Sequence, residues 1–351
     1  MVEWLAGNRI RGTNSERING TSEIPAVSGG WKELGRTTSS GSTITVSSLP
    51  DKRYYMFLYD ATAQASGGSD NNWRFNGDTG SNYAHRKQVN GASDSTGTGQ
   101  TRIYNMESGG SRHEFGLFYL SNLDSKEKLM AGHNVINWTS GAGGEVGRKE
   151  IVGKWVNTAD ALNAIQLYYS SGSATSGEVV VLGWDPDDTH TDNFWEELAS
   201  VDLSGGSADV LDSGTFTAKK YLWIQAFMEQ DGGIISGVLN FNNDTGSNYA
   251  RRRSSNGGSD GTETSHTSID IRGGDPQNRF ENLFIINNAS KEKLVIGNMM
   301  VTTAGAGNAP NRTEYVAKWA NTSNQITSVK WTNGDAGSYG TSSIIKVWGH
   351  D

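Results

Sequence analysis

The residues best suited to chemistry lie in one short loop that occurs twice in the sequence. The first copy is FNGDTGSNYA at 75–84 and the second is FNNDTGSNYA at 241–250, and an arginine follows each. Carboxylate and amide oxygens suit a hard cation or a glycan hydroxyl, and a tyrosine ring can stack on a sugar. The candidate ligand-binding residues are Asp78, Asn82, Tyr83, Arg86, Asp244, Asn248, Tyr249 and Arg252.

Turn formation is the alternative interpretation of this loop, and the residue types favour it. Asn-Gly, Asp-x-Gly and Ser-Asn are what a tight hairpin needs where φ is positive. The EF-hand spacing D-x-D-x-D-G is absent, so any calcium site would have to be formed by the loop itself. No cofactor is predicted, and a loop-type calcium site stays open.

The rest of the sequence offers no recognisable catalytic group. The six histidines do not recur between the two copies, and no G-x-S-x-G nucleophile motif is present. The glycine-rich segments at 141–147 and 305–312 fit neither phosphate-loop pattern, so we expect hairpin loops there. A polysaccharide lyase or hydrolase would need two positioned carboxylates or a base beside an arginine, and no such pair can be chosen from the sequence. We therefore predict no catalytic and no metal-binding residues, and a protein that is not an enzyme.

An internal duplication is the main feature of the chain. Besides the loop, SKEKL occurs at 125–129 and again at 290–294, and Trp184 matches Trp348 at the ends of the two copies. The spacing stays near about 165 residues throughout, which predicts two copies of one domain.

The residue pattern of each copy predicts a series of strands. Apolar and aromatic residues alternate at 53–59 and 221–229, as in strands with two differently packed faces. Further strands are expected at 41–47, 114–121, 126–136, 149–156 and 163–169. About eight to ten strands per copy, with turns every 8 to 15 residues or so, predict an all-β fold of two tandem, homologous, jelly-roll-like β-sandwich domains.

The duplication also sets the expected domain boundaries. Residues 1–30 lie outside the repeat and are expected to form an N-terminal arm, and 31–184 form the first β-sandwich repeat. The polar, acidic stretch 185–193 is the expected linker, and 194–351 form the second repeat.

Composition narrows the range of partners. The net charge is −8 and the basic residues are scattered, which argues against nucleic acid as a partner. No apolar run approaches the length of a membrane span, so membrane insertion is not expected. Cysteine is absent, so stability must come from packing.

Tryptophans recur in the two copies, as in Lys154-Trp155 and Lys318-Trp319 and in the terminal Trp184 and Trp348. Exposed, they would suit binding to a partner or a sugar. Their repetition favours a role in core packing.

Several motifs together resemble a known group of duplicated proteins. They are the opening MVEWLAGNRIRGT, the WKELGRTT segment, the repeated F-N-[NG]-D-T-G-S-N-Y loop, the SKEKL strand and the segment from GAG at 305–307 to KWANTS at 318–323. This combination resembles duplicated all-β virion structural proteins of marine archaeal or bacterial viruses, over nearly the whole chain. The resemblance implies a virion location, and it assigns no residue a role.

Two functions are consistent with these observations. The first is a non-enzymatic viral structural protein, such as a capsid, decoration or fibre component, that assembles with itself, as a trimer, and with other virion proteins. The second is a tandem lectin-like protein that binds host surface glycans through the two repeated loops.

Overall fold

The computed structural model describes residues 30–63, 68–109, 112–270, 277–302 and 305–351. The expected N-terminal arm therefore lies, except for its last residue, outside the described residues. Every regular element in the described part of the chain is a β-strand. This part also contains no helix long and apolar enough to cross a membrane.

The first domain contains twelve strands in two sheets. The large sheet has the order β1-β12-β3-β8-β9-β10-β5-β6 and the small sheet β2-β11-β4-β7. The strands are β1 (Lys32–Gly41), β2 (Thr43–Ser47), β3 (Tyr54–Ala63), β4 (Gly68–Phe75), β5 (Tyr83–Val89), β6 (Ser95–Gln100), β7 (Ile103–Gly109), β8 (His113–Ser121), β9 (Lys128–Asn137), β10 (Val146–Trp155), β11 (Ala164–Tyr169) and β12 (Ala174–Trp184).

The second domain repeats this topology strand for strand. Its large sheet has the order β13-β26-β15-β21-β22-β23-β18-β19, and its small sheet β14-β24-β17-β20. The strands are β13 (Glu196–Asp202), β14 (Val210–Asp212), β15 (Tyr221–Met228), β16 (Gln230–Asp231), β17 (Val238–Phe241), β18 (Tyr249–Ser255), β19 (Gly261–His266), β20 (Ile269–Asp270), β21 (Arg279–Ile286), β22 (Lys293–Val301), β23 (Asn311–Trp319), β24 (Val329–Thr332), β25 (Ser338–Tyr339) and β26 (Ile344–His350). Strands β16 and β25 form an added two-stranded sheet.

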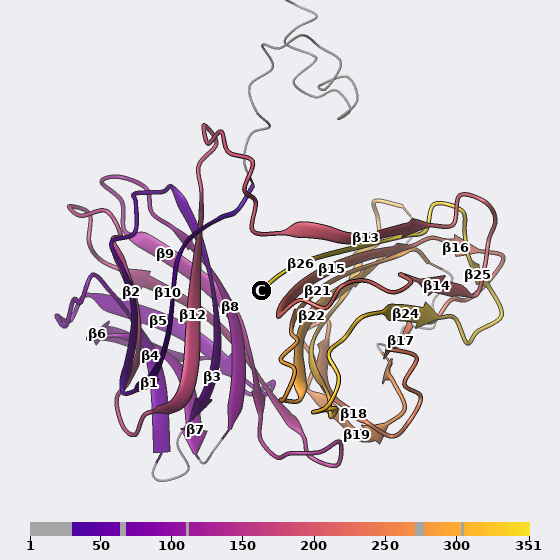
Figure 1. Ribbon diagram of the computed structural model, residues 1–351, viewed down its shortest axis with the longest axis horizontal. Coiled ribbons are helices and arrows are strands. Elements are labelled where there is room, and N and C mark those ends of the chain that lie inside the picture. Colours follow the sequence, from indigo (N-terminus) through magenta and orange to yellow (C-terminus); the bar gives the residue numbers. More distant parts are fainter. Residues whose placement is uncertain (1–29, 64–67, 110–111, 271–276, 303–304) are drawn as a thin grey trace, which may run out of the picture.

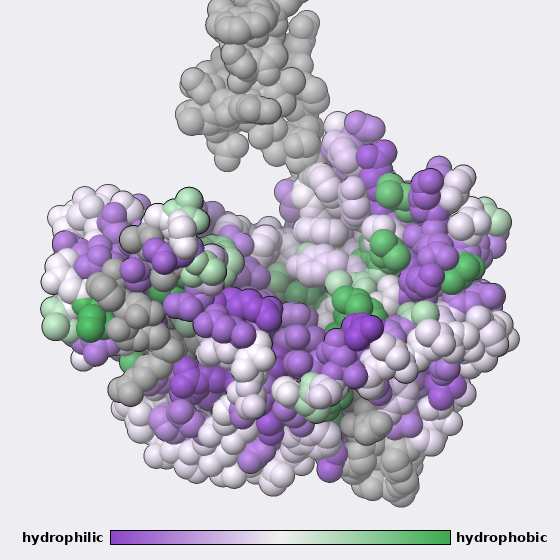
Figure 2. Space-filling view, turned by 180° about the vertical axis from the view of Figure 1, so that it is seen from behind, coloured by the Kyte–Doolittle hydropathy of each residue, from purple (hydrophilic) through white to green (hydrophobic). Residues whose placement is uncertain are grey.

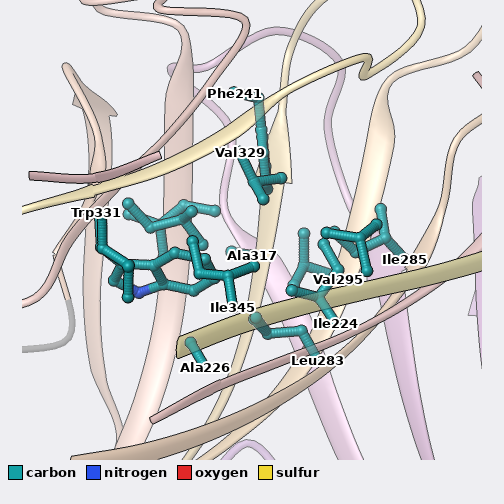
Figure 3. Close-up of a cluster of buried hydrophobic side chains, with 14 of the residues drawn as sticks. Ile224, Ala226, Phe241, Leu283, Ile285, Val295, Ala317, Val329, Trp331 and Ile345 are labelled. Carbon is teal, nitrogen blue, oxygen red and sulfur yellow. The ribbon is translucent and has the colours of Figure 1, made fainter. Parts of the chain in front are cut away.

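A hydrophobic core fills each sandwich between its large and its small sheet. In the first domain Phe57 of β3 packs on Trp73 of β4, with their ring centroids 4.8 Å apart. In the second domain Ile224 of β15 and Trp331 of β24 belong to the matching core (Figure 3). Alternate residues of each strand point into this core, so the other half must face outward from the sheet.

The outward faces of the two large sheets pack on each other. Strands β8, β9 and β10 of the first domain contact β22 and β23 of the second. Figure 1 shows the strands of the small sheets, such as β2 and β24, on the outer sides of this arrangement. The described part of the molecule is therefore a stack of four layers, with the domain contact in the middle.

The expectation of two tandem, homologous β-sandwiches is confirmed. The number of strands was underestimated, because twelve and fourteen form where about eight to ten per domain were expected. Each domain has more strands than the eight of a simple jelly roll. The first domain's last strand ends at Trp184 and the second domain's first strand begins at Glu196. Between them, Asp185 and Asp188 form ion pairs with Lys52.

Candidate functional site

The repeated loop of the first domain is held together by its own aspartate. One oxygen of Asp78 accepts the backbone N–H of Gly80 at 2.7 Å, and the other accepts the amide of Asn82 at 2.9 Å and the indole N–H of Trp155 at 2.7 Å. Burial alone would raise the pKa of Asp78, but these three hydrogen bonds outweigh it and lower the pKa. The carboxylate thus ties the loop to the core.

The second domain repeats this arrangement. Asp244 accepts from Gly246 at 2.8 Å, from Asn248 at 2.9 Å and from the indole of Trp319 at 2.7 Å. Both tryptophans are 1% exposed, so the expected core role of these two residues is confirmed. The same expectation is wrong for Trp184 and Trp348, which are only partly buried and lie outside the two sandwich cores.

The loop tyrosines do not offer a surface for sugar stacking. Tyr83 is 1% exposed and Tyr249 is fully buried. Each hydroxyl donates to the carbonyl of its loop aspartate, Tyr83 to Asp78 at 3.1 Å and Tyr249 to Asp244 at 3.0 Å. Burial raises the pKa of Tyr83 to about 12, so the hydroxyl stays a donor at neutral pH. The stacking role proposed for these rings is wrong because the core encloses both.

Turn formation is confirmed as the structural role of the neighbouring residues. Asn76 and Gly77, directly before Asp78, both have positive φ, at 51° and 67°. Asn90 and Gly91 share this conformation at the β5–β6 turn. Positive φ at two successive residues is the conformation that Asn-Gly favours in tight turns. Only the turn at Asn90-Gly91 joins paired strands, whereas that at Asn76-Gly77 leads from the small sheet to the large one. Among the described residues, no group of three or more acidic or histidine side chains gathers to hold a metal.

The two arginines lie away from the loops that they follow. Arg86 is exposed on β5 and pairs with Asp94 at 3.2 Å. Arg252 of β18 instead reaches the first domain, where it pairs with Glu145 at 2.7 Å and donates to the carbonyl of Val146 at 2.8 Å. The structure therefore brings together Asp78, Asn82 and Tyr83 in one domain and Asp244, Asn248 and Tyr249 in the other, without the arginines.

An apolar face of a different kind covers one end of the first domain's large sheet. We call it the first-domain docking face. Trp31 contacts Tyr119, with 6.2 Å between ring centroids, and Tyr54 stacks on Trp184 at 5.6 Å. These rings line a groove of about 410 Å³. The residues of this face are Trp31, Tyr54, Tyr119, Leu123, Leu129, Val152 and Trp184.

The first-domain docking face is unusually exposed for a surface made of apolar side chains. Tyr119 is 40% exposed, Val152 51% and Leu129 55%. Contiguous apolar surface of this kind marks a binding or interaction site more often than single scattered residues do. Figure 2 shows apolar residues, in green, in the hollow between the domains and in patches on the first domain, which lies on the right in that view.

In the second domain the matching face is buried by the domain contact. We call it the second-domain docking face: Trp195, Tyr221, Phe284, Ile286, Leu294, Ile296 and Val316. It packs on a second outward patch of the first domain, the first-domain receiving face. This face consists of Met56, Leu58, Phe115, Leu117, Val135, Val180 and Leu182.

Polar contacts surround this domain contact. Arg148 pairs with Asp260 at 2.7 Å. The carboxylate of Glu178 accepts the hydroxyl of Tyr221 at 2.7 Å. Lys318 pairs with Glu292 of its own domain at 3.3 Å and donates across the contact to Asn137 at 2.9 Å. The interface therefore combines an apolar centre with ion pairs at its edge, as stable protein interfaces do.

Strand register identifies which residues of the two domains correspond. Glu33 faces Leu182 across β1 and β12, and Glu197 faces Trp348 across β13 and β26. The counterpart of Trp348 is thus Leu182, and the match of Trp184 with Trp348 made from sequence is wrong by two residues. A small difference in the spacing of the repeat, which the sequence alone did not resolve, explains the error.

Neither the docking face nor the receiving face of the first domain was predicted from the sequence. A signal was present in the strand at 53–59, where Tyr54, Met56 and Leu58 alternate with the core residues and are themselves apolar. A strand that is apolar on both sides indicates that both sides are covered.

No family model and no curated protein matches the chain. Among solved structures, domains LG4-5 of the mouse laminin alpha1 chain align over 94% of this chain and 92% of that chain, at 10% identity and a TM-score of 0.20. OpdQ of Pseudomonas aeruginosa aligns over 85% of this chain and 98% of that chain, at 8% identity and a TM-score of 0.12. Neither similarity is close enough to bear on fold or function.

Proposed function

We propose that this protein is a non-enzymatic structural protein that acts by assembling with further copies of itself. One observation carries the proposal. The first-domain docking face exposes residues whose counterparts in the second domain are buried in a protein contact. Leu129 is 55% exposed and its counterpart Leu294 is fully buried.

The virion is the proposed setting, and it rests on the sequence resemblance to duplicated virion proteins. A capsid, decoration or fibre component requires repeated contacts between identical chains and surfaces that exclude water. A trimer is the proposed closed form, because three chains would place six similar domains around one axis. Other virion proteins would bind the surfaces that such a trimer leaves free.

The test is self-association measured by sedimentation velocity and light scattering over a wide range of protein concentration. We expect the full chain to form a defined oligomer, and Val152→Glu to prevent it, because a charge cannot be buried unpaired in an apolar contact. Val210→Glu is the matched control, since Val210 is 42% exposed but lies on the small sheet of the second domain. A chain that stays monomeric at every concentration would falsify the proposal.

Carbohydrate binding is a second candidate, favoured by the aromatic groove rather than by the repeated loops. Trp31, Tyr54 and Trp184 are partly exposed, and aromatic rings of this kind stack on sugars. A glycan array with the wild-type chain and Trp31→Ala tests it. Glycan binding that is lost in this variant would favour a lectin, while no binding by the wild type removes the candidate.

A further inference from the structure

The contact between the two domains is of the head-to-tail kind. The second domain uses its docking face and the first domain uses its receiving face, which lie on different parts of equivalent sheets. Such a contact leaves one unused face of each type, in contrast to a two-fold contact between identical patches. The unused faces are the docking face of the first domain and the receiving face of the second.

We infer that the first-domain docking face of one chain binds the second-domain receiving face of another copy. This inference rests on the proposed function and specifies which two surfaces of the chain form the contact between copies. The second-domain receiving face consists of the residues that occupy, in the second domain, the same strand positions as the first-domain receiving face. These residues are Trp223, Gln225, Phe280, Asn282, Met300, Lys346 and Trp348.

Exposure on the second-domain receiving face supports this inference. Met300 is 47% exposed, whereas its counterpart Val135 is fully buried under the second domain. The side chain of Arg312 is 61% exposed, whereas that of its counterpart Arg148 is 4% exposed. The same positions are therefore covered in one domain and open in the other.

The ion pairs at the edge of the contact also have counterparts. Within the chain, Asp260 and Arg148 pair at 2.7 Å, with side chains 2% and 4% exposed. The counterpart of Asp260 is Asp94, which is 45% exposed and pairs with the exposed Arg86 at 3.2 Å. In the inferred contact, Asp94 of one chain meets Arg312 of the next. The inferred contact between chains therefore has an ion pair at the position equivalent to the Asp260–Arg148 pair of the internal contact.

Two polar pairs of the internal contact have less polar counterparts on the open faces. Within the chain, Asn288 donates to Asp60 at 2.6 Å. The counterparts of these residues on the open faces are Leu123 and Phe227. A carboxylate that faces an amide thus becomes a ring that faces an aliphatic side chain, so both members have changed in a way that keeps them complementary.

In the second pair the tyrosine is kept and only its acceptor is replaced. Within the chain, Tyr221 donates to Glu178 at 2.7 Å. On the open faces, the counterpart of Glu178 is Ile344 and that of Tyr221 is Tyr54. A buried carboxylate without a partner would oppose docking. Neither Phe227 nor Ile344 brings one, which favours a second copy of this chain as the occupant.

A repeated head-to-tail contact closes into a ring or continues as a filament, according to the rotation between neighbours. The two domains of one chain already represent one step of this assembly. Each added chain would extend the series with a contact of the same kind, so internal and external contacts would alternate along it.

The test is a charge exchange across the inferred contact, with self-association measured by sedimentation velocity. Asp94→Arg and Arg312→Asp should each weaken association by about tenfold or more, because each places like charges opposite one another. The double variant should restore association, since the pair is then re-formed in reverse. Asp335→Arg, in an exposed loop of the second domain, is the control and should associate like the wild type.

Each outcome separates this inference from the proposed function. If the charge variants assemble normally while Val152→Glu does not, the docking face binds another surface and the inference is wrong, although self-assembly stands. If the double variant fails to recover, the pairing of Asp94 with Arg312 is wrong. If the wild-type chain stays monomeric, both proposals fail. Unchanged unfolding midpoints in all variants should accompany these measurements, since both residues are exposed.

Discussion

The aspartate of each repeated loop links a surface turn to a buried tryptophan. Replacing Asp78 with Ala leaves the indole N–H of Trp155 buried without its acceptor. An unsatisfied buried donor costs about 1–3 kcal/mol, and we expect the free energy of unfolding to fall by that amount. Urea unfolding at neutral pH measures the change.

Two comparisons make this prediction specific. Asp244→Ala, which removes the equivalent acceptor of Trp319, should cost about as much, because the distances in the two loops agree within 0.1 Å. Asp124→Ala, at an exposed position, should change little. If Asp78→Ala were no more harmful than Asp124→Ala, the loop would not depend on this carboxylate.

At the level of strands, two glycines in the large sheets make room for aromatic rings. A Cβ at Gly132 of β9 would overlap the ring of Phe118, and one at Gly297 of β22 would overlap the ring of Tyr315. Both rings lie on strands paired with the glycine. We expect Gly132→Ala and Gly297→Ala each to lower the free energy of unfolding by about 1–3 kcal/mol through overpacking.

Gly261 of β19 is the matched control for these substitutions. It also lies in a strand of a large sheet, but nothing stands within 4 Å of where its Cβ would be. Gly261→Ala should leave stability unchanged or raise it slightly, because alanine restricts the unfolded chain. Thermal unfolding of the three variants decides the matter, and equal effects at all three positions would contradict the role assigned to the rings.

The strands whose apolar residues alternate or cluster were predicted from the sequence. Strands that form because they pair with an adjacent strand were missed. Strand β8 follows its expected range closely, and strand β3 begins as expected but continues to Ala63, beyond the expected end at residue 59. Strand β6 reads STGTGQ and has no buried residue, so only its pairing with β5 makes it a strand. Strand β4 begins with polar residues and was also missed, although its Trp73 is fully buried.

The candidate site was predictable in its parts but not in its role. The sequence located the repeated loops correctly, since a motif that occurs twice is visible without a structure. Whether Tyr83 faces solvent or the core depends on which sheet face it joins, and a shift of one residue in the strand reverses that answer. The docking face joins the strand ends around Tyr54, Tyr119 and Leu129, which are far apart in sequence.

At the scale of the whole molecule, the duplication allows equivalent residues of the two domains to be compared with each other. The two domains share a topology, so each docking residue has a counterpart in the same strand environment. The two positions differ mainly in what covers them. A difference in behaviour between counterparts therefore reports on the contact and not on the fold.

Leu294 and Leu129 are such a pair, because both are leucines that face Lys318 and Lys154 on the neighbouring strand. Leu294 is fully buried in the domain contact, so Leu294→Ala should lower the free energy of unfolding by about 2–5 kcal/mol. Leu129→Ala should leave the unfolding of the dissociated chain within about 0.5 kcal/mol of the wild type, because the side chain is exposed there. It should nevertheless weaken self-association, and sedimentation of the same samples would show this. Equal losses of stability in both variants would mean that Leu129 already has a partner within its own chain, and the docking face would then be a part of the fold and not a site of assembly.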